Sequence, residues 1–175
     1  MSGEQAADLD LGAPRSGQTS EERLRALCDK QELLELVTRY CRAVDRCDLD
    51  LLLSCYHPDA IDDHGTFKGR PADVFPAILD RFRAMPPTQH ILSNALFEIH
   101  GDVAYGEVYM AVRTGGPDPA PGPEPFGRNL DRYERRGGPW RIAQRRVIIE
   151  KLPGDRDHTG FLLGRKDRRD PSYKR

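Results

Sequence analysis

The chain has 175 residues, a length that suits one domain, because a single hydrophobic core usually serves about 100–200 residues. Hydrophobic residues make up 38% and charged residues 31%, and the formal net charge of -1 gives no overall attraction to nucleic acid. No apolar run approaches the roughly 20 residues that span a bilayer, and the amino terminus lacks the pattern of a signal peptide. We therefore expect a cytoplasmic protein that binds neither nucleic acid nor membranes.

The amino-terminal part of the sequence predicts a disordered leader followed by a long helix. Residues 1–19 are rich in Gly, Ala, Ser and acidic side chains and show no hydrophobic period. Thr19 and Glu22 have the spacing of a capping box, so a helix should begin there. Apolar residues at helical spacing then predict one buried stripe that extends to Asp45: Leu24, Leu27, Leu34, Val37, Cys41 and Val44.

All four cysteines fall in or just after this helix, at Cys28, Cys41, Cys47 and Cys55. Cys28 and Cys41 are too far apart along one helix to form a disulfide, and no CxxC pair of the kind that binds zinc is present. We therefore expect reduced thiols that pack as small hydrophobic residues, and no metal site.

Two shorter helices are predicted next. Asp48 is placed to cap a helix that ends near His57-Pro58, and a short strand and turn follow over residues 60–68. Pro71 suits the first turn of a third helix, which a Pro-Pro pair ends. The apolar positions of this third helix are Val74, Phe75, Ile78, Leu79 and Phe82.

Beyond the third helix the hydrophobic period changes to that of strands, and the loop at residues 115–126 is too rich in Pro and Gly to lie inside a sheet. The predicted strands are 88–100, 103–113, 128–136 and 140–151. Helices followed by a meander of strands define an α+β fold. We predict a cone-shaped roll, with three helices packed on a strongly curved antiparallel sheet that encloses a pocket for a small molecule.

The predicted domain covers residues 20–152 and leaves a charged carboxyl-terminal tail over residues 153–175. The tail contains one apolar cluster, Phe161-Leu162-Leu163. This cluster either docks over the pocket mouth or onto another subunit, or belongs to a frayed tail.

Four segments together resemble one known family: RYCRAVDRCDLDLLLSCYHPDA, GTFKG, TQHILSN and DRYERRGGPWRI. They are similar to the SnoaL-like branch of the nuclear transport factor 2-like superfamily, over roughly residues 22–150. Members of this branch include scytalone dehydratase, bacterial bile-acid dehydratase and hexachlorocyclohexane dehydrochlorinase. The resemblance implies a cofactor-independent enzyme that forms dimers or trimers.

The resemblance also implies a set of site residues. In the last two of these enzymes an Asp at the end of the first helix orients a His on the first long strand, and that His removes a proton from the substrate. Asp45 and His90 occupy these positions. Tyr40 matches a catalytic Tyr of the bile-acid enzyme, and Arg145 matches an Arg that lines the dehydrochlorinase pocket.

The residues themselves support the same pair. Asp45 continues the apolar stripe of its helix and should point inward, at a helix end where the macrodipole disfavours a negative charge. A histidine N–H is a natural donor to such a carboxylate, which would leave the other ring nitrogen free as a base. The alternative is that Asp45 caps its own turn and that His90 is an ordinary core histidine.

Other candidates have two interpretations each. Tyr40 either donates its hydroxyl to the substrate or packs in the core. Strict alternation places Arg145 opposite Ile142, where it either binds a substrate oxygen or pairs with Asp62 or Glu107. Four apolar residues match pocket-lining positions, although core packing explains them equally well: Phe67, Phe82, Val108 and Met110.

The remaining polar candidates give weaker evidence for a functional site. Asp59, Asp62, Asp63 and His64 form an acidic cluster that suggests either a hard cation or, more simply, a solvated strand edge. His57, His100 and His158 adjoin turns and should be exposed. We expect neither a metal nor a cofactor.

The sequence therefore predicts a lyase or isomerase, most directly a dehydratase, that abstracts a proton from a small, largely apolar cyclic substrate. His90 would be the general base, Asp45 its orienting partner, and Tyr40 either the acid or a hydrogen-bond donor. Two other classes fit the same fold: a small-molecule-binding protein without catalysis, and the small subunit of a ring-hydroxylating oxygenase.

Overall fold

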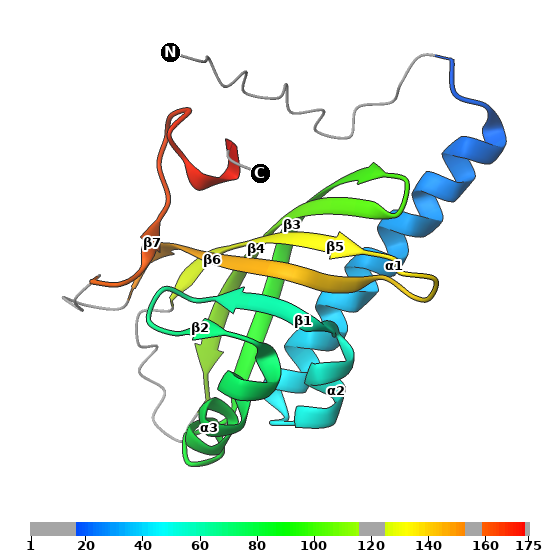
Figure 1. Cartoon of the computed structure of the whole chain (residues 1–175). Helices are drawn as coiled ribbons and strands as arrows, with labels where there is room; N and C mark the ends of the chain where they lie inside the picture. Colours follow the sequence, from blue (N-terminus) through cyan, green and yellow to red (C-terminus); the bar gives the residue numbers. More distant parts are fainter. Residues whose placement is uncertain (1–16, 116–124, 153–158, 174–175) are drawn as a thin grey trace.

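The computed structural model describes residues 17–115, 125–152 and 159–173 (Figure 1). The helices are α1 Ser20–Asp45, α2 Leu49–Ser54 and α3 Pro71–Arg83. The strands are β1 Tyr56–Asp63, β2 Lys68–Gly69, β3 Thr88–His100, β4 Val103–Thr114, β5 Phe126–Glu134, β6 Arg141–Lys151 and β7 Leu162–Leu163, and a 3-10 helix over Pro171–Tyr173 follows. Most of the predicted leader and of the predicted loop at 115–126 lies outside the described residues. None of these helices combines the length and the apolar composition needed to cross a membrane.

The strands form one curved sheet in the order β2-β1-β6-β5-β4-β3, with β7 also paired to β6. Neighbouring strands from β3 to β6 are antiparallel, as predicted, whereas β1 and β7 both run parallel to β6. The sheet is therefore mixed and not purely antiparallel, because β1 and β7 flank β6 in parallel. In Figure 1, α1 crosses behind the sheet, and α2 and α3 lie at the lower end of the molecule, where α1 ends.

Helix α1 begins where the capping box predicts. Thr19 Oγ1 accepts the backbone N–H of Glu22 at 3.2 Å, and Glu22 Oε2 accepts the N–H of Thr19 at 2.8 Å. The predicted stripe is wrong over the first turns, because Leu24 and Leu27 are 61% and 65% exposed and Figure 1 shows this part of α1 projecting past the strands. The buried face starts further along the helix: Leu33, Leu36, Val37, Tyr40, Cys41, Ala43 and Val44.

Strand β1 begins earlier than the sequence predicts, directly after α2. His57 lies in this strand and is buried, with Nε2 3.1 Å from the carbonyl oxygen of Glu134, so its predicted exposure is wrong. The cause is the pairing of β1 with β6, a contact between distant parts of the chain. The four cysteines are free thiols; Cys41 and Cys55 are buried and Cys28 is exposed.

The core lies between the helices and the inner face of the sheet. Helix α1 packs along β3, and α3 packs against β1 and β2. The core residues from the helices include Leu33, Val37, Phe75 and Leu79, and those from the strands include Val108, Tyr133 and Ile142. All of these are almost or wholly inaccessible to solvent.

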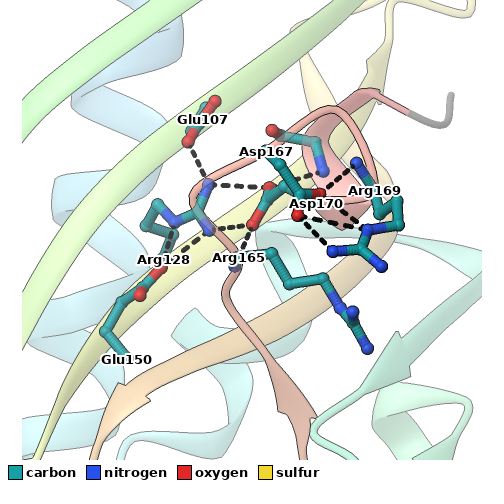
Figure 2. A network of polar contacts seen from close by, with 8 residues as sticks. Glu107, Arg128, Glu150, Arg165, Asp167, Arg169 and Asp170 are labelled. Carbon is teal, nitrogen blue, oxygen red and sulfur yellow. Dashed lines mark hydrogen bonds and ion pairs between the residues drawn. The ribbon is translucent and has the colours of Figure 1, made fainter.

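The carboxyl-terminal segment is fixed to the outer face of the sheet by Arg128 (Figure 2). The Arg128 guanidinium donates to Asp170 at 3.1 and 2.8 Å, to Glu107 at 2.5 Å and to Glu150 at 2.7 Å. Asp170 also accepts the backbone N–H of Arg165 at 2.7 Å. The interpretation as a frayed tail is therefore wrong for residues 159–173, which dock on their own domain.

This docking brings the segment to the turn that follows β1. Leu162 and Leu163 pair with β6, and a side-chain Cβ at Gly65 would lie only 2.2 Å from the carbonyl oxygen of Gly160. Gly65 also has a φ of +77°, which favours glycine. A residue without a side chain is thus required where the two segments touch.

Replacing Asp170 by Asn should detach this segment. Hydrogen bonds to charged groups contribute about 1.5–3 kcal/mol each, so trypsin should cleave at Arg165–Arg169 at least about tenfold faster in Asp170→Asn than in wild type. Burial raises the pKa of Asp170, but hydrogen bonds from Arg128 and from the segment's own residues outweigh it and hold the pKa below its usual value. The contribution of Asp170 to the stability of the docked segment is therefore present at neutral pH. It is lost as acid protonates the carboxylate, below about pH 4.

Asp167→Asn is the matched control, because Asp167 pairs with the exposed Arg169 and does not reach the sheet. Its cleavage rate should stay close to that of wild type. Equal acceleration in both variants would mean that Arg128 does not hold the segment.

Candidate active site

Asp45 and His90 meet where the end of α1 crosses the start of β3. His90 Nδ1 lies 2.6 Å from Asp45 Oδ1, which is the predicted hydrogen bond. The backbone N–H of His90 donates to Oδ2 at 2.9 Å, and Thr88 Oγ1 donates to Oδ1 at 3.2 Å. The carboxylate therefore binds β3 and does not cap its own helix turn.

This arrangement sets the chemistry of the imidazole. Nδ1 carries the proton that faces the carboxylate, so Nε2 has a free lone pair and can act as a base. Burial raises the pKa of Asp45, but hydrogen bonds from the side chain and the backbone of His90 outweigh it and hold the pKa below its usual value. Asp45 is thus ionised at neutral pH and can stabilise the imidazolium that forms when His90 takes a proton.

Tyr40 lies in an aromatic cluster of the core. Its ring is edge-on to Tyr56 and to Phe75, with centroids 6.0 and 6.4 Å away. The guanidinium of Arg145 lies over the same ring at 4.0 Å. Burial raises the pKa of Tyr40 well above its usual value, so its hydroxyl keeps its proton at neutral pH and can donate a hydrogen bond.

Arg145 forms a buried ion pair with Asp131. Nε and Nη2 donate to the two carboxylate oxygens at 2.8 and 2.6 Å, and both side chains are fully buried. Tyr133 donates its hydroxyl to the same carboxylate at 2.7 Å. The predicted pairing with Asp62 or Glu107 is therefore wrong. Strict alternation also fails, because the β5–β6 register shifts between Arg132 and Tyr133 and leaves Ile142 and Arg145 both buried.

Among the buried polar atoms that have no hydrogen-bond partner within the described residues, three belong to the neighbouring strands β5 and β6. They are Nη1 of Arg145 and both amide atoms of Asn129, a side chain that is 1% exposed. Asn129 and Asp131 lie two residues apart on β5, so both side chains point to the inner face of the sheet. Buried polar groups are normally paired, so Nη1 of Arg145 and the Asn129 amide nitrogen can donate to an oxygen of a small molecule or of an ordered water, and the Asn129 amide oxygen can accept from a hydroxyl or a water. The sequence marks Asn129 only as a polar residue at an inward position.

The four predicted lining residues divide into two groups. Val108 is fully buried, whereas Phe67, Phe82 and Met110 are partly exposed and pack against the core. Leu92 pairs with Met110 across β3 and β4 and is also only partly buried. The sheet is therefore only partly covered around Leu92 and Met110, two residues along β3 from His90.

A second Asp–His pair lies at the end of β1. Asp62 is fully buried, accepts the hydroxyl of Tyr56 at 2.5 Å and is hydrogen-bonded to Nδ1 of His64. The predicted solvated strand edge is thus wrong for Asp62, because β1 is covered by β6 on one side and β2 on the other. In the described part of the chain, no three acidic, His or Cys side chains are grouped so as to hold a metal ion.

A cavity of about 360 Å³ lies away from the Asp45–His90 pair, on the side of the sheet that carries the carboxyl-terminal segment. Its lining includes Tyr105, Glu107, Leu130, Arg132, Gln144, Arg146 and Ser172. None of the predicted site residues lines it.

The profile of the SnoaL-like domain matches residues 25–146, which is most of the chain. The chain belongs to the SnoaL-like domain family. No curated protein matches this SnoaL-like sequence.

Several solved structures share the SnoaL-like fold of this chain. A "Putative Scytalone Dehydratase" from Novosphingobium aromaticivorans has a TM-score of 0.69 at 14% identity, over 83% of this chain and 99% of its own. LinA has a TM-score of 0.65 at 20% identity, over 78% and 96%. An NTF2-like protein with a cystatin-like fold from Novosphingobium aromaticivorans has a TM-score of 0.65 at 22% identity, over 76% and 91%. At these identities the similarity establishes the fold alone.

The buried ion pair of Arg145 and Asp131 should be required for the stability of this SnoaL-like chain. Arg145→Met or Asp131→Leu alone leaves a buried charge unpaired and should lower the free energy of unfolding by about 3–5 kcal/mol. The double variant should lose much less than the sum of the two, since no charge remains. Urea unfolding of the four proteins measures this coupling.

Arg70→Met is the matched control, because Arg70 pairs with Asp73 on the surface and should change stability by less than about 0.5 kcal/mol. Additive losses in the double variant would contradict the proposed dependence of each buried charge on the other.

Proposed function

We propose that this protein is a cofactor-independent lyase or isomerase, most directly a dehydratase, acting on a small, largely apolar cyclic substrate. The observation that carries the proposal is the 2.6 Å hydrogen bond from His90 Nδ1 to Asp45, which leaves Nε2 available as a base. The name of one structural neighbour, "Putative Scytalone Dehydratase", supports chemistry of this kind.

The site supports a simple elimination. His90 Nε2 removes a proton from a carbon next to a carbonyl group, and the electrons of the broken C–H bond form a C=C bond as the neighbouring C–O bond breaks. The hydroxyl takes up a proton from the solvent and leaves as water. Asp45 stabilises the imidazolium throughout, and general bases positioned in this way typically contribute about 100–10,000-fold.

The surroundings of the pair suit this reaction. His90 and Asp45 have side chains that are 10% and 12% exposed, so their mutual attraction is only weakly screened by water. The three hydrogen bonds from β3 to the carboxylate hold it in one orientation, which fixes the tautomer of the ring.

The test uses 3-hydroxy-1-tetralone, a bicyclic β-hydroxy ketone that becomes fluorescent 1-naphthol when it loses water. His90→Gln should lower kcat/KM by at least about 100-fold, while the dissociation constant stays within about tenfold, because a general base acts mainly in the transition state. Asp45→Asn should also lower the rate strongly, since an amide cannot stabilise the imidazolium charge.

His100→Gln is the matched control, because His100 lies at the far end of β3 with a side chain that is 48% exposed. Its rate should equal that of wild type. A wild-type protein that binds the ketone tightly for hours without converting it would refute the enzymatic proposal and favour a binding protein.

A further inference from the structure

The cavity on the outer face of the sheet has a floor of six side chains from three neighbouring strands. The strand register arranges them in two rows across β4, β5 and β6. The first row is Glu107, Leu130 and Arg146, and the second is Tyr105, Arg132 and Gln144. Directly opposite side chains in a sheet are about 4.5–5.5 Å apart, so the six form one continuous surface.

The carboxyl-terminal segment supplies a further wall of this cavity. Ser172 lines the cavity, and its backbone N–H donates to Asp170 Oδ1 at 3.0 Å. Asp170 is held in turn by Arg128, which also binds Glu107 of the floor (Figure 2). The cavity therefore keeps this wall only while the segment is docked.

The charges of the lining favour an anion. Both carboxylates of the lining already have a cationic partner, since Glu107 binds Arg128 and Asp131 binds Arg145 on the inner face. The lining also contains two arginines. A cation that entered the cavity would therefore meet neutralised carboxylates and two positive charges.

The two arginines are placed to bind one anion together. Arg132 and Arg146 are diagonal neighbours on β5 and β6, a separation that long side chains can bridge. Arg132 pairs with Glu134 through Nη1, and its side chain is 39% exposed, so its other N–H groups can donate to a second anion. Leu130 and Tyr105 lie beside them in the floor and offer a flat apolar surface.

We propose that this cavity binds a small aromatic carboxylate, and that the bound ligand stabilises the docked carboxyl-terminal segment. Arg132 and Arg146 bind the carboxylate, and the ring packs on Leu130 and Tyr105. A cavity of about 360 Å³ is within the range that binds small organic ligands. Since the ligand contacts a wall that exists only in the docked state, binding and docking favour each other. The site lies on the opposite face of the sheet from Asp45 and His90 and does not depend on the proposed function.

The probe is 2-naphthoate, and 2-naphthamide is its uncharged counterpart of the same shape. Calorimetry should show that the acid binds at least about tenfold more tightly than the amide, because hydrogen bonds to a charged group are the stronger ones. Arg132→Gln and Arg146→Gln should each weaken binding of the acid by about fivefold or more and that of the amide by less than about twofold. Gln144→Glu should also weaken binding of the acid, because it adds a negative charge to the floor.

Arg136→Gln is the matched control, because Arg136 shares Glu134 with Arg132 and does not line the cavity. Its affinity for 2-naphthoate should equal that of wild type. An equal loss in Arg136→Gln and Arg132→Gln, or equal affinities for the acid and the amide, would overturn the anion site. Binding that is lost in His90→Gln and kept in both lining-arginine variants would place the probe in the other site and overturn the proposal as well.

Tryptic cleavage at Arg165–Arg169 tests the link to the segment. At ten times its dissociation constant, 2-naphthoate should slow this cleavage of wild type by about tenfold, because it binds only the docked state. Asp170→Asn should bind the probe at least about fivefold more weakly, and the probe should not slow its cleavage, which also excludes direct inhibition of trypsin. Asp167→Asn should behave as wild type. Tight binding that leaves the cleavage rate of wild type unchanged would refute the coupling, and absence of binding by wild type would refute the site.

Discussion

A guanidinium group that is sealed from water must have its charge balanced inside the protein, and Arg145 imposes this constraint on the whole core. Asp131 on β5 balances the charge with two hydrogen bonds, and Tyr40 on α1 covers the planar face at 4.0 Å. One side chain thus fixes β6 against β5 and α1 against the sheet. The position of α1 in turn determines where Asp45, five residues after Tyr40, meets β3.

The two Asp–His pairs depend on the fold in different ways. Asp45 and His90 come from distant parts of the chain, so their contact exists only when α1 is packed on β3. Asp62 and His64 are two residues apart and form their contact within one turn, next to the contact of Gly65 with the carboxyl-terminal segment. The geometry of the first pair therefore depends on the packing of the core. The geometry of the second pair depends on a local turn and on the carboxyl-terminal segment that adjoins it.

The sequence predicts local features of this protein better than contacts between strands. The cap at Thr19, the inward orientation of Asp45 and its contact with His90 follow from the helical period together with the family resemblance. The partner of Arg145 cannot be predicted in this way, because it depends on a register shift between β5 and β6. The burial of Asp62 depends on pairing of β1 with β6, which no local pattern reveals.

The pairing of β1 with β6 has a consequence for how the chain is made. Ribosomes synthesise from the amino terminus, so α1, α2 and β1 emerge while the strand that must cover β1 is still untranslated. Until β6 is complete, the nascent chain leaves an edge of β1 open and has no Arg145 with which to pair Asp131. Closure of the core is therefore a late, long-range event, and long-range strand pairing of this kind slows folding.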